Sequence, residues 1–397
     1  MADLRSGPGA AKALQAAHDL TPGLAARAAE ADRDAAVPAA DVTDLRDAGL
    51  AGLLVPEALG GAGAGFADYT EVALVLAAAS PATALVFNMH ASVTGAVALT
   101  PDEVALALGA PPEWPAARAE FLRSAAEGSL YSVAMSERGS GARLTGMAST
   151  YRADPGGGWR IHAAKAFCSG AGALDGYVVA AHAEDDPATV SQFVVRADTP
   201  GITVTRSWDP LGMRGTGSQD VAFDVLVGPG ALLGGVEGLA PLIAASLPQW
   251  MVASYAAVYA GLATAIVDEA AGYLRRRHLT ALPAARARLG QADAAAAAAT
   301  AVVRHAAHLV DADPGGEETN RWVWRAKLVA GDAAATAADT CLQACGTAAT
   351  RRGEVLERLV RDGRCGQLQP PPSDVCADWL GAAALGEDPD EAPVPRW

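Results

Sequence analysis

The stretch WDPLGMRGTGSQDVAFDVLV, residues 208–227, joins a glycine-rich turn to a run of alternating apolar side chains. Alternation at period two between turn residues is typical of antiparallel strands. Other short apolar or alternating runs lie upstream, separated by glycine, proline or aspartate: YSVAM (131–135), GWRIHAAKAF (158–167), GYVVAAHA (176–183), VSQFVVRA (190–197) and GITVTRSW (201–208). The sequence therefore predicts a β domain over residues 129–230.

The segments on either side of this domain have the composition of helices. Residues 1–128 carry alanine and leucine at helical spacing, and residues 231–397 contain runs such as ADAAAAAATAVVRHAAHLV (292–310). Alanine is the strongest helix former, and its small side chain allows close packing. A chain of 397 residues is also too long for one ordinary core. We therefore expect an α-helical N-terminal domain (1–128), the β domain (129–230) and a C-terminal helical bundle (231–397).

The charge balance excludes some classes of protein. Thirty basic against 45 acidic residues give a net charge of −15, which opposes nucleic-acid binding because cations must displace phosphate counterions. The five cysteines are an odd number, and their spacing matches no metal-site or disulfide pattern. We expect no metal site and no nucleic-acid partner.

Neither a signal peptide nor a membrane span is predicted. The N-terminus lacks the apolar core of a signal peptide. The most apolar run, PATALVFNMHASVTGAVAL (81–99), contains Asn88, His90 and small polar residues, which favours a buried helix over a membrane span. We expect a cytoplasmic protein that does not associate with membranes.

Three parts of the chain resemble motifs of the acyl-CoA dehydrogenase family. VPEALGGAGAGFADYTEV (55–72) is similar to the family's VPEEYGG turn. The pair YSVAMSERGSGARL (131–144) and WRIHAAKAFCSGAGALDGYVVAA (159–181) resembles its TEPGAGSD segment and its G-x-K strand. Residues 208–227 are close to its GMRGTGS run. The resemblance implies an α+β fold with an α-helical N-domain, an antiparallel β-barrel middle domain and a C-terminal four-helix bundle, assembled as a homodimer or homotetramer.

The resemblance also implies the cofactor FAD. A flavin ring needs hydrogen-bond donors at its pyrimidine edge, where negative charge accumulates on reduction. By resemblance Ser136 would face O2 and N1 of the ring, Ser169 would reach N5 and O4, and Phe167 would flank the ring. The alternative interpretation is that the two serines only cap turns at strand ends.

Contacts to the FAD tail are less well preserved. By resemblance Arg277 would meet the cofactor pyrophosphate across a dimer interface, and Gln343 and Gly346 would belong to a glycine-rich tail loop. The phenylalanine–glycine step after the arginine is missing, and two loop glycines are replaced, as Thr347 and Ala348 follow Gly346. Glycine at such a place lets backbone N–H groups approach a phosphate.

The expected substrate is an acyl group on CoA or on a carrier protein. The family's serine–aspartate pair, which helps to hold the CoA pantetheine, is replaced by Ala142 and Arg143 after Gly141. Arg143 has the planar guanidinium that suits a phosphate, and we expect it with Gly141 at the substrate site. A solvated surface arginine is the alternative.

The family's catalytic glutamate is missing from both of its usual positions. One position falls on Pro370, in RDGRCGQLQPPPSDV (361–375), and the other near Met251. Neither side chain can accept a proton, as a general base must. Asp374 is the nearest acid, and would serve only if the proline turn redirects the chain; otherwise it caps the following helix. The catalytic residue is therefore unknown.

Three functions remain open at this level. The first is a flavin-dependent α,β-dehydrogenation of an acyl thioester with a non-standard base. The second is a flavin-dependent monooxygenase of the same fold, which needs no α-proton abstraction. The third is a non-catalytic family member that acts as a binding subunit. The missing glutamate argues against plain dehydrogenation, and the serine pair argues against the loss of the flavin site.

Overall fold

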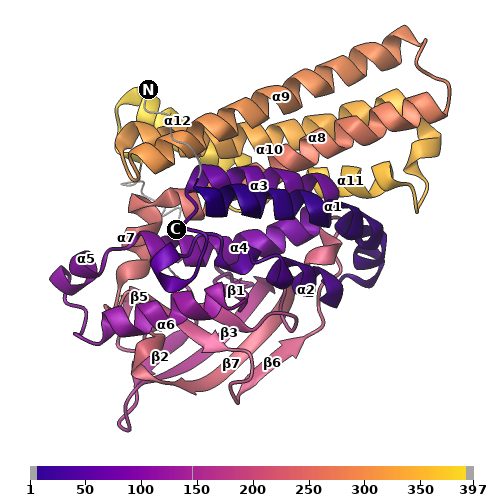
Figure 1. Ribbon diagram of the computed structural model, residues 1–397. Helices are drawn as coiled ribbons and strands as arrows, with labels where there is room; N and C mark the ends of the chain where they lie inside the picture. Colours follow the sequence, from indigo (N-terminus) through magenta and orange to yellow (C-terminus); the bar gives the residue numbers. More distant parts are fainter. Residues whose placement is uncertain (1–6, 145, 390–397) are drawn as a thin grey trace.

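Helices precede and follow a central sheet in the computed structural model, which describes residues 7–144 and 146–389. The sheet lies at one end of the molecule, the N-terminal helices lie next to it, and the long C-terminal helices stack beyond them (Figure 1). This arrangement confirms the expected α+β fold class. Short 3₁₀ turns connect the elements: η1 (Leu50–Gly52), η2 (Glu57–Leu59), η3 (Arg214–Thr216), η4 (Pro229–Ala231), η5 (Pro248–Trp250) and η6 (Thr347–Thr350).

The N-terminal part places one apolar helix, α4, in the centre of the protein. Its helices are α1 (Pro8–Asp34), α2 (Ala39–Asp47), α3 (Phe66–Ala79), α4 (Pro81–Leu99), α5 (Asp102–Ala107) and α6 (Trp114–Ala126). The Ser80 hydroxyl caps α4 by accepting the Thr83 N–H. Gly95 is required on this helix, because a Cβ there would lie 2.2 Å from the ring of Trp250. That close contact joins α4 to the C-terminal part.

Seven strands of the described chain form one curled sheet. They are β1 (Tyr131–Ala134), β2 (Thr150–Ala153), β3 (Trp159–Cys168), β4 (Gly176–Ala183), β5 (Asp186–Arg196), β6 (Ile202–Thr205) and β7 (Gln219–Val227). The order is β1-β4-β2-β3-β7-β6, with β5 paired to β4. In β7 the alternation seen in the sequence places Val221, Phe223 and Val225 in the core.

The sheet is antiparallel except at two pairs. β1–β4 and β2–β4 are parallel. A parallel pair needs a long crossover connection, and the segment between β1 and β4 is long because it contains β2 and β3. The expected antiparallel description therefore holds for the remaining pairs.

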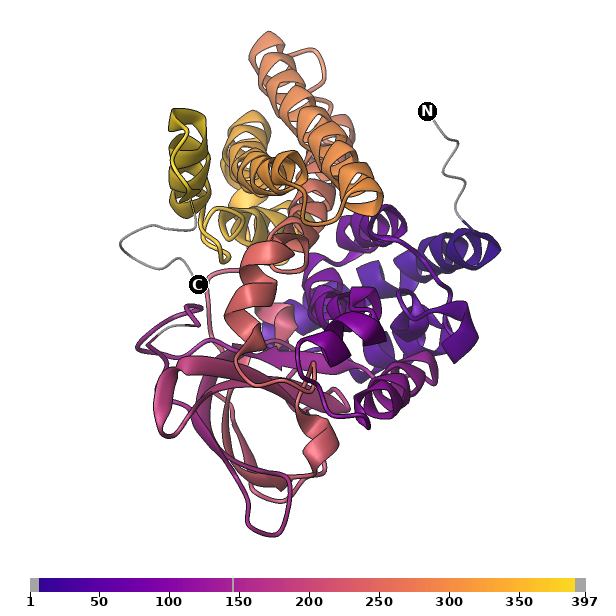
Figure 2. The same cartoon turned by 90° about the vertical axis from the view of Figure 1, so that its left-hand side faces the viewer.

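The C-terminal part is a helical bundle. It contains α7 (Leu239–Ser246), α8 (Ala253–Arg276), α9 (Pro283–Ala312), α10 (Glu317–Cys345), α11 (Val355–Arg364) and α12 (Ser373–Leu385). Alanine-rich faces pack α8, α9 and α10 closely, and α11 packs against α8 and α10. Helix α7 lies between this bundle and the sheet (Figure 2). Cys341 and Cys345 are buried free thiols of this core.

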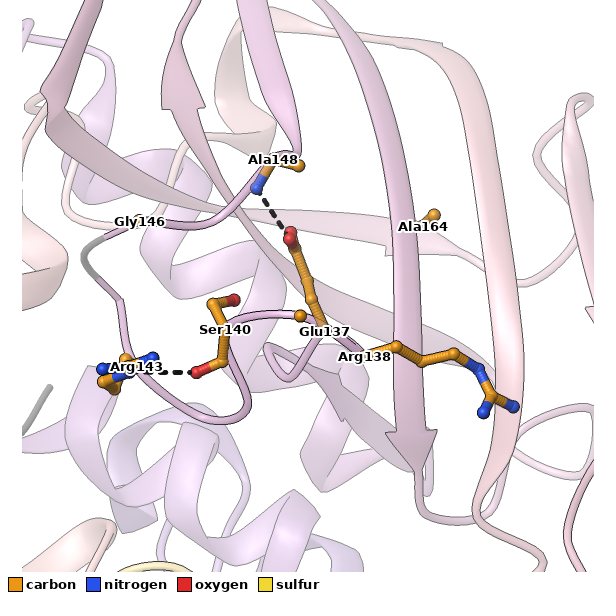
Figure 3. A pocket seen from close by; sticks show the side chains of 8 residues that line it. Glu137, Arg138, Ser140, Arg143, Gly146, Ala148 and Ala164 are labelled. Carbon is orange, nitrogen blue, oxygen red and sulfur yellow. Dashed lines mark hydrogen bonds between the residues drawn. The ribbon is translucent and has the colours of Figure 1, made fainter.

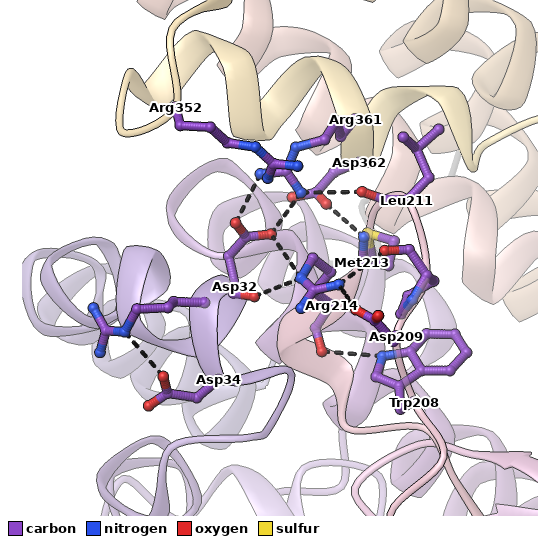
Figure 4. Close-up of polar contacts among 12 residues, drawn as sticks. Asp32, Asp34, Trp208, Asp209, Leu211, Met213, Arg214, Arg352, Arg361 and Asp362 are labelled. Carbon is purple, nitrogen blue, oxygen red and sulfur yellow. Dashed lines mark hydrogen bonds and ion pairs between the residues drawn. The ribbon is translucent and has the colours of Figure 1, made fainter.

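An ion-pair network joins the three parts of the chain (Figure 4). Arg361 of α11 donates to both carboxylate oxygens of Asp32 in α1, at 2.8 and 2.7 Å, and to the Leu211 carbonyl at 3.0 Å. The next residue, Asp362, is buried and accepts the Met213 N–H at 2.5 Å. Burial raises the pKa of Asp362 to about 6, against the Met213 hydrogen bond that lowers it. The loop 208–218 is thus held between the N-terminal helices and the bundle.

Among residues 7–144 and 146–389, two segments are long and apolar enough to cross a membrane by length and composition, Pro81–Leu99 and Pro248–Arg276. In each, 83% of the most apolar window is buried inside the protein. Both segments therefore have the surroundings of core helices.

Candidate active site

A cavity of about 400 Å³ lies where the three parts of the chain meet. Its volume falls within the range of small-molecule sites, roughly 300–1,000 Å³. Its walls come from α4, the start of the β1–β2 loop, β4, β5, the loop 208–218, α7, the start of α8 and the segment after α11. None of the described lining residues carries a charge.

The two serines expected at a flavin both line this cavity. Ser136 follows β1, and Ser169 follows β3 at 6% exposure. The Ser169 hydroxyl lies 2.9 Å from that of Ser218, which lies 2.7 Å from that of Thr216. Thr216 donates its only hydroxyl hydrogen to the Met213 carbonyl. In this arrangement Ser218 donates to Thr216 and Ser169 to Ser218. A ring acceptor at Ser169 would receive the Ser169 hydrogen once the row reverses, with Thr216 donating to Ser218 and Ser218 to Ser169 at the loss of the bond to the Met213 carbonyl.

A β-bulge presents Phe167 at the same wall. The register of β3 against β7 shifts between Lys165 and Cys168, and Phe167 has φ +59°. A bulky residue in this left-handed conformation is strained by about 1–3 kcal/mol, and such strain clusters at functional sites. Phe167 is 57% exposed, and its ring meets the Trp208 ring edge-on at 5.9 Å between centroids. The bulge thus places an aromatic face beside Ser169.

A buried ion pair braces the loop that carries Ser136. Lys165 of β3 donates to Glu137 at 2.8 Å, and its side chain is fully buried. The Glu137 carboxylate also accepts the N–H groups of Ala148 and Ser149 and the Ser149 hydroxyl; Figure 3 shows the bond from Ala148. Burial alone would raise the pKa of Glu137, but these hydrogen bonds and the lysine together lower it.

Both positions that the resemblance implies for the family's catalytic base lie at this cavity. Met251 and Pro370 line it, and neither is a proton acceptor. Polar side chains of the lining close to these positions in the sequence are neutral: Trp250 beside Met251, Tyr255 in the first turn of α8, and Gln369 beside Pro370. Burial raises the pKa of Tyr255 to about 12, so that its hydroxyl stays protonated at neutral pH.

Asp374 does not lie among the lining residues. It is in the first turn of α12, where its carboxylate accepts the Val375 N–H at 2.9 Å. The N-cap position itself is occupied by Pro372. The proline turn therefore does not bring Asp374 to the cavity, and the expectation that it is the N-cap is off by two residues.

Arg143 and Gly141 lie on the outer side of the loop. A separate surface pocket is lined by Arg143, Arg138 and Ser140 (Figure 3). Arg143 bonds the Ser140 carbonyl of its own loop at 3.2 Å. Gly141, at φ +67°, pairs with Glu137 through backbone hydrogen bonds. Neither residue lines the main cavity, and their substrate-binding role stays a prediction.

The three tail-binding candidates lie on the bundle. Arg277 follows the C-terminal end of α8, Gln343 is near the end of α10, and Gly346 follows that end. All three are exposed and none lines the cavity of this chain. A contact with the cofactor would require a second copy of the chain, so these assignments also stay predictions.

His90 belongs to the core. Its Nε2 lies 2.7 Å from the Ala51 carbonyl, and its Nδ1 accepts the Tyr131 N–H at 3.2 Å. Burial lowers its pKa to about 4. This histidine is therefore neutral at physiological pH and holds α4 against β1.

Sequence reasoning did not single out several cavity residues. Thr216 and Ser218 stand inside the quoted GTGS run, so a signal for them was present. Trp208, Gln192 and Tyr255 carry no pattern of their own. Only the packing of distant segments brings them to one cavity.

Three domain models of one protein family match this chain. The N-terminal, middle and C-terminal domains of acyl-CoA dehydrogenase match residues 16–101, 132–226 and 249–375. The amino sugar nitrososynthase RubN8 of Streptomyces rubradiris is 32% identical over 385 residues, which cover 93% of this chain and 88% of RubN8. This chain belongs to the acyl-CoA dehydrogenase family.

Other relatives of this chain carry names and ligands of different kinds. The putative acyl-CoA dehydrogenase YdbM of Bacillus subtilis is 27% identical over 368 residues, covering 90% of this chain and 92% of YdbM. The structure of KijD3 with FMN and a dTDP-linked amino keto sugar has a TM-score of 0.85 at 28% identity, covering 98% and 96% of the two chains. FMN-bound TdsC from Paenibacillus has a TM-score of 0.82 at 26% identity, covering 94% and 97%.

These relatives make the family member a flavin-dependent oxidoreductase. Its own residues fit a flavin, since an uncharged cavity of sufficient volume is bordered by the hydroxyls of Ser136 and Ser169 and by the presented ring of Phe167. The recognition of the family from sequence is confirmed. A flavin is supported, whereas FAD in particular and an acyl thioester substrate are not confirmed, because the flavin in the structures of KijD3 and TdsC is FMN.

Proposed function

We propose that this acyl-CoA dehydrogenase-family protein is a flavin-dependent monooxygenase that uses FMN. The observation that carries the proposal is the lack of any carboxylate among the described residues of the cavity, with Met251 and Pro370 at the two base positions. Abstraction of an α-proton needs a positioned base, worth roughly 10²–10⁴ in rate. Oxygen transfer to a substrate does not need that proton to be removed.

The overall reaction balances with one external reductant. A bound flavin would pass on two electrons from this reductant, and with two protons from solvent one atom of dioxygen would enter the substrate and the other would leave as water. The protein's part is to hold the ring beside Ser136, Ser169 and Phe167, to orient the substrate and to exclude water. The largely apolar walls serve that last purpose, since closing a site to water prevents side reactions.

The relatives favour the same reaction class. RubN8 is named as an amino sugar nitrososynthase, and TdsC is described as a dibenzothiophene monooxygenase. FMN in place of FAD is consistent with the replaced residues in the segments expected to contact the FAD tail, because FMN has a single phosphate and no adenosine. We also propose a cytoplasmic homodimer or homotetramer, in which Arg277, Gln343 and Gly346 of one subunit approach the flavin phosphate of another.

The test compares the two reactions on one preparation. Anaerobic butyryl-CoA is expected to leave the absorbance of the FMN-loaded protein unchanged, with enoyl-CoA formation at least about 100-fold below that of a base-containing relative assayed in parallel. With reduced FMN and ¹⁸O₂, label is expected in the product from one of indole, dibenzothiophene or a dTDP-linked amino sugar. Bleaching by butyryl-CoA with stoichiometric enoyl-CoA, and no labelled product, would overturn the proposal in favour of dehydrogenation.

A further inference from the structure

The inner wall of the cavity is formed by side chains that the flavin assignment does not use. Val93 and Val97 of α4 face this space together with Leu239 and Ile243 of α7. Helix α7 is held on the sheet by Ala240 and Ala244, which pack against Met135 and Val190. Helix α7 thus forms a wall of the cavity that is fixed to the sheet.

No described residue of this wall can neutralise a phosphate or an ammonium group. An uncompensated charge in an apolar cavity costs several kcal/mol even after relaxation. Two long cations from neighbouring segments do not remedy this, because they are already paired. Arg118 donates to the Val97 and Ala98 carbonyls at the end of α4, and Arg138 pairs with Asp220 at 2.5 Å.

Another cation near the mouth, Arg143, lies in the outer pocket and bonds its own loop. Arg206, two residues before Trp208, is exposed to solvent. A diphosphate at that place would meet a solvated arginine whose interaction is worth at most about 1 kcal/mol. The net charge of −15 adds long-range repulsion of polyanions. The surroundings of the cavity therefore also disfavour a nucleotide or CoA moiety.

One amide is available on the sheet side. Gln192 of β5 lines the cavity, and its side-chain nitrogen contacts the Met135 sulfur at 3.5 Å. A thioether is a weak acceptor, so a ligand carbonyl or ring nitrogen would bind this amide better. Gln192 is suited to orient one neutral polar group on a ligand that is otherwise apolar.

From these features we infer that the substrate is a neutral, mostly apolar ring compound with at most a few hydrogen-bonding groups, and that it is not linked to a nucleotide or to CoA. The inference rests on the proposed oxygenase function and selects the substrate class for it. An amine substrate must enter this site in its uncharged form.

Equilibrium binding tests the substrate class without turnover. The oxidised, FMN-loaded protein is titrated with indole, with dTDP and with CoA, and perturbation of the flavin absorbance is followed. Indole is expected to saturate the signal, and the two nucleotides are expected to give no change at the same concentrations and not to displace indole. Binding of dTDP or CoA that competes with indole, or binding of either nucleotide without any binding of indole, overturns the inference.

A matched pair of variants on α7 locates the binding. Ile243→Asp places a carboxylate in the wall and is expected to weaken indole binding about 10-fold or more while FMN stays bound. Leu242→Asp, at a neighbouring residue that is 53% exposed and outside the lining, is expected to bind indole like the parent protein. Equal indole binding by the parent and Ile243→Asp contradicts the inference. If the parent protein does not bind FMN, the result contradicts the proposed function itself rather than the substrate class.

Discussion

Replacing Lys165 with methionine is expected to lower the free energy of unfolding by about 3 kcal/mol or more, because the change leaves Glu137 charged and buried without its cation. Methionine keeps most of the apolar stem, so the loss reports the ion pair rather than a cavity. Lys165 is fully buried and Glu137 is only 8% exposed at the side chain. Urea denaturation of the parent and the variant measures the difference.

Two further variants separate the ion pair from general damage to β3. Arg160→Met, on the same strand, removes a half-exposed arginine whose acidic neighbours are 3.8 and 4.0 Å away, and should change stability by at most about 1 kcal/mol. The double variant Lys165→Met with Glu137→Gln should recover part of the loss, since it removes the unpaired charge. If Lys165→Met is as stable as Arg160→Met, the ion pair of Lys165 and Glu137 does not brace the loop that carries Ser136.

Replacing Arg361 with methionine is expected to cost about 3 kcal/mol, because two carboxylates lose the same cation at once. Arg361 is 9% exposed at the side chain and pairs with Asp32 and Glu357, each at 2.7 Å. The resulting repulsion between the two acids adds to the lost hydrogen bonds. The strong pairing also raises the pKa of Arg361 above its ordinary value, chiefly through the hydrogen bonds to Asp32.

The control for this variant is Arg304→Met. Arg304 makes two comparable bonds to Glu71 at 2.6 and 2.8 Å, but it is 51% exposed. Exposed pairs contribute about 0–1 kcal/mol, so this change should be nearly neutral in urea denaturation. Limited proteolysis of Arg361→Met should also show faster cleavage in the loop 208–218, which loses the bond from Arg361 to the Leu211 carbonyl. If Arg361→Met and Arg304→Met lose the same free energy of unfolding, burial does not make the Arg361 ion pairs more stabilising than the exposed pair.

Local patterns predicted much of the fold. The run 176–183 coincides with β4, and the apolar run 81–99 coincides with the buried helix α4. The short strand β2 (Thr150–Ala153) was not predicted, because its exposed Arg152 and Ala153 interrupt any alternation. The parallel pairing of β1 with β4 also has no local signal, since it depends on which segments lie between the two strands.

The candidate site was predictable only in part. Ser136, Phe167 and Ser169 lie at one cavity, as the motif resemblance implied. The wall made by α7 was not foreseen, because nothing in an eight-residue apolar helix indicates which cavity it closes.

The central claim is that this cavity holds a flavin ring against Ser169, and titration of the protein with FMN tests it most directly. The account predicts one FMN per chain with a changed absorption spectrum, and about 10-fold weaker binding by Ser169→Val through loss of one hydrogen bond of roughly 1.4 kcal/mol. Thr203→Val on the exposed strand β6 should bind FMN like the parent. Failure of the parent to bind either FMN or FAD, or equal FMN affinity of the parent and Ser169→Val, would contradict it.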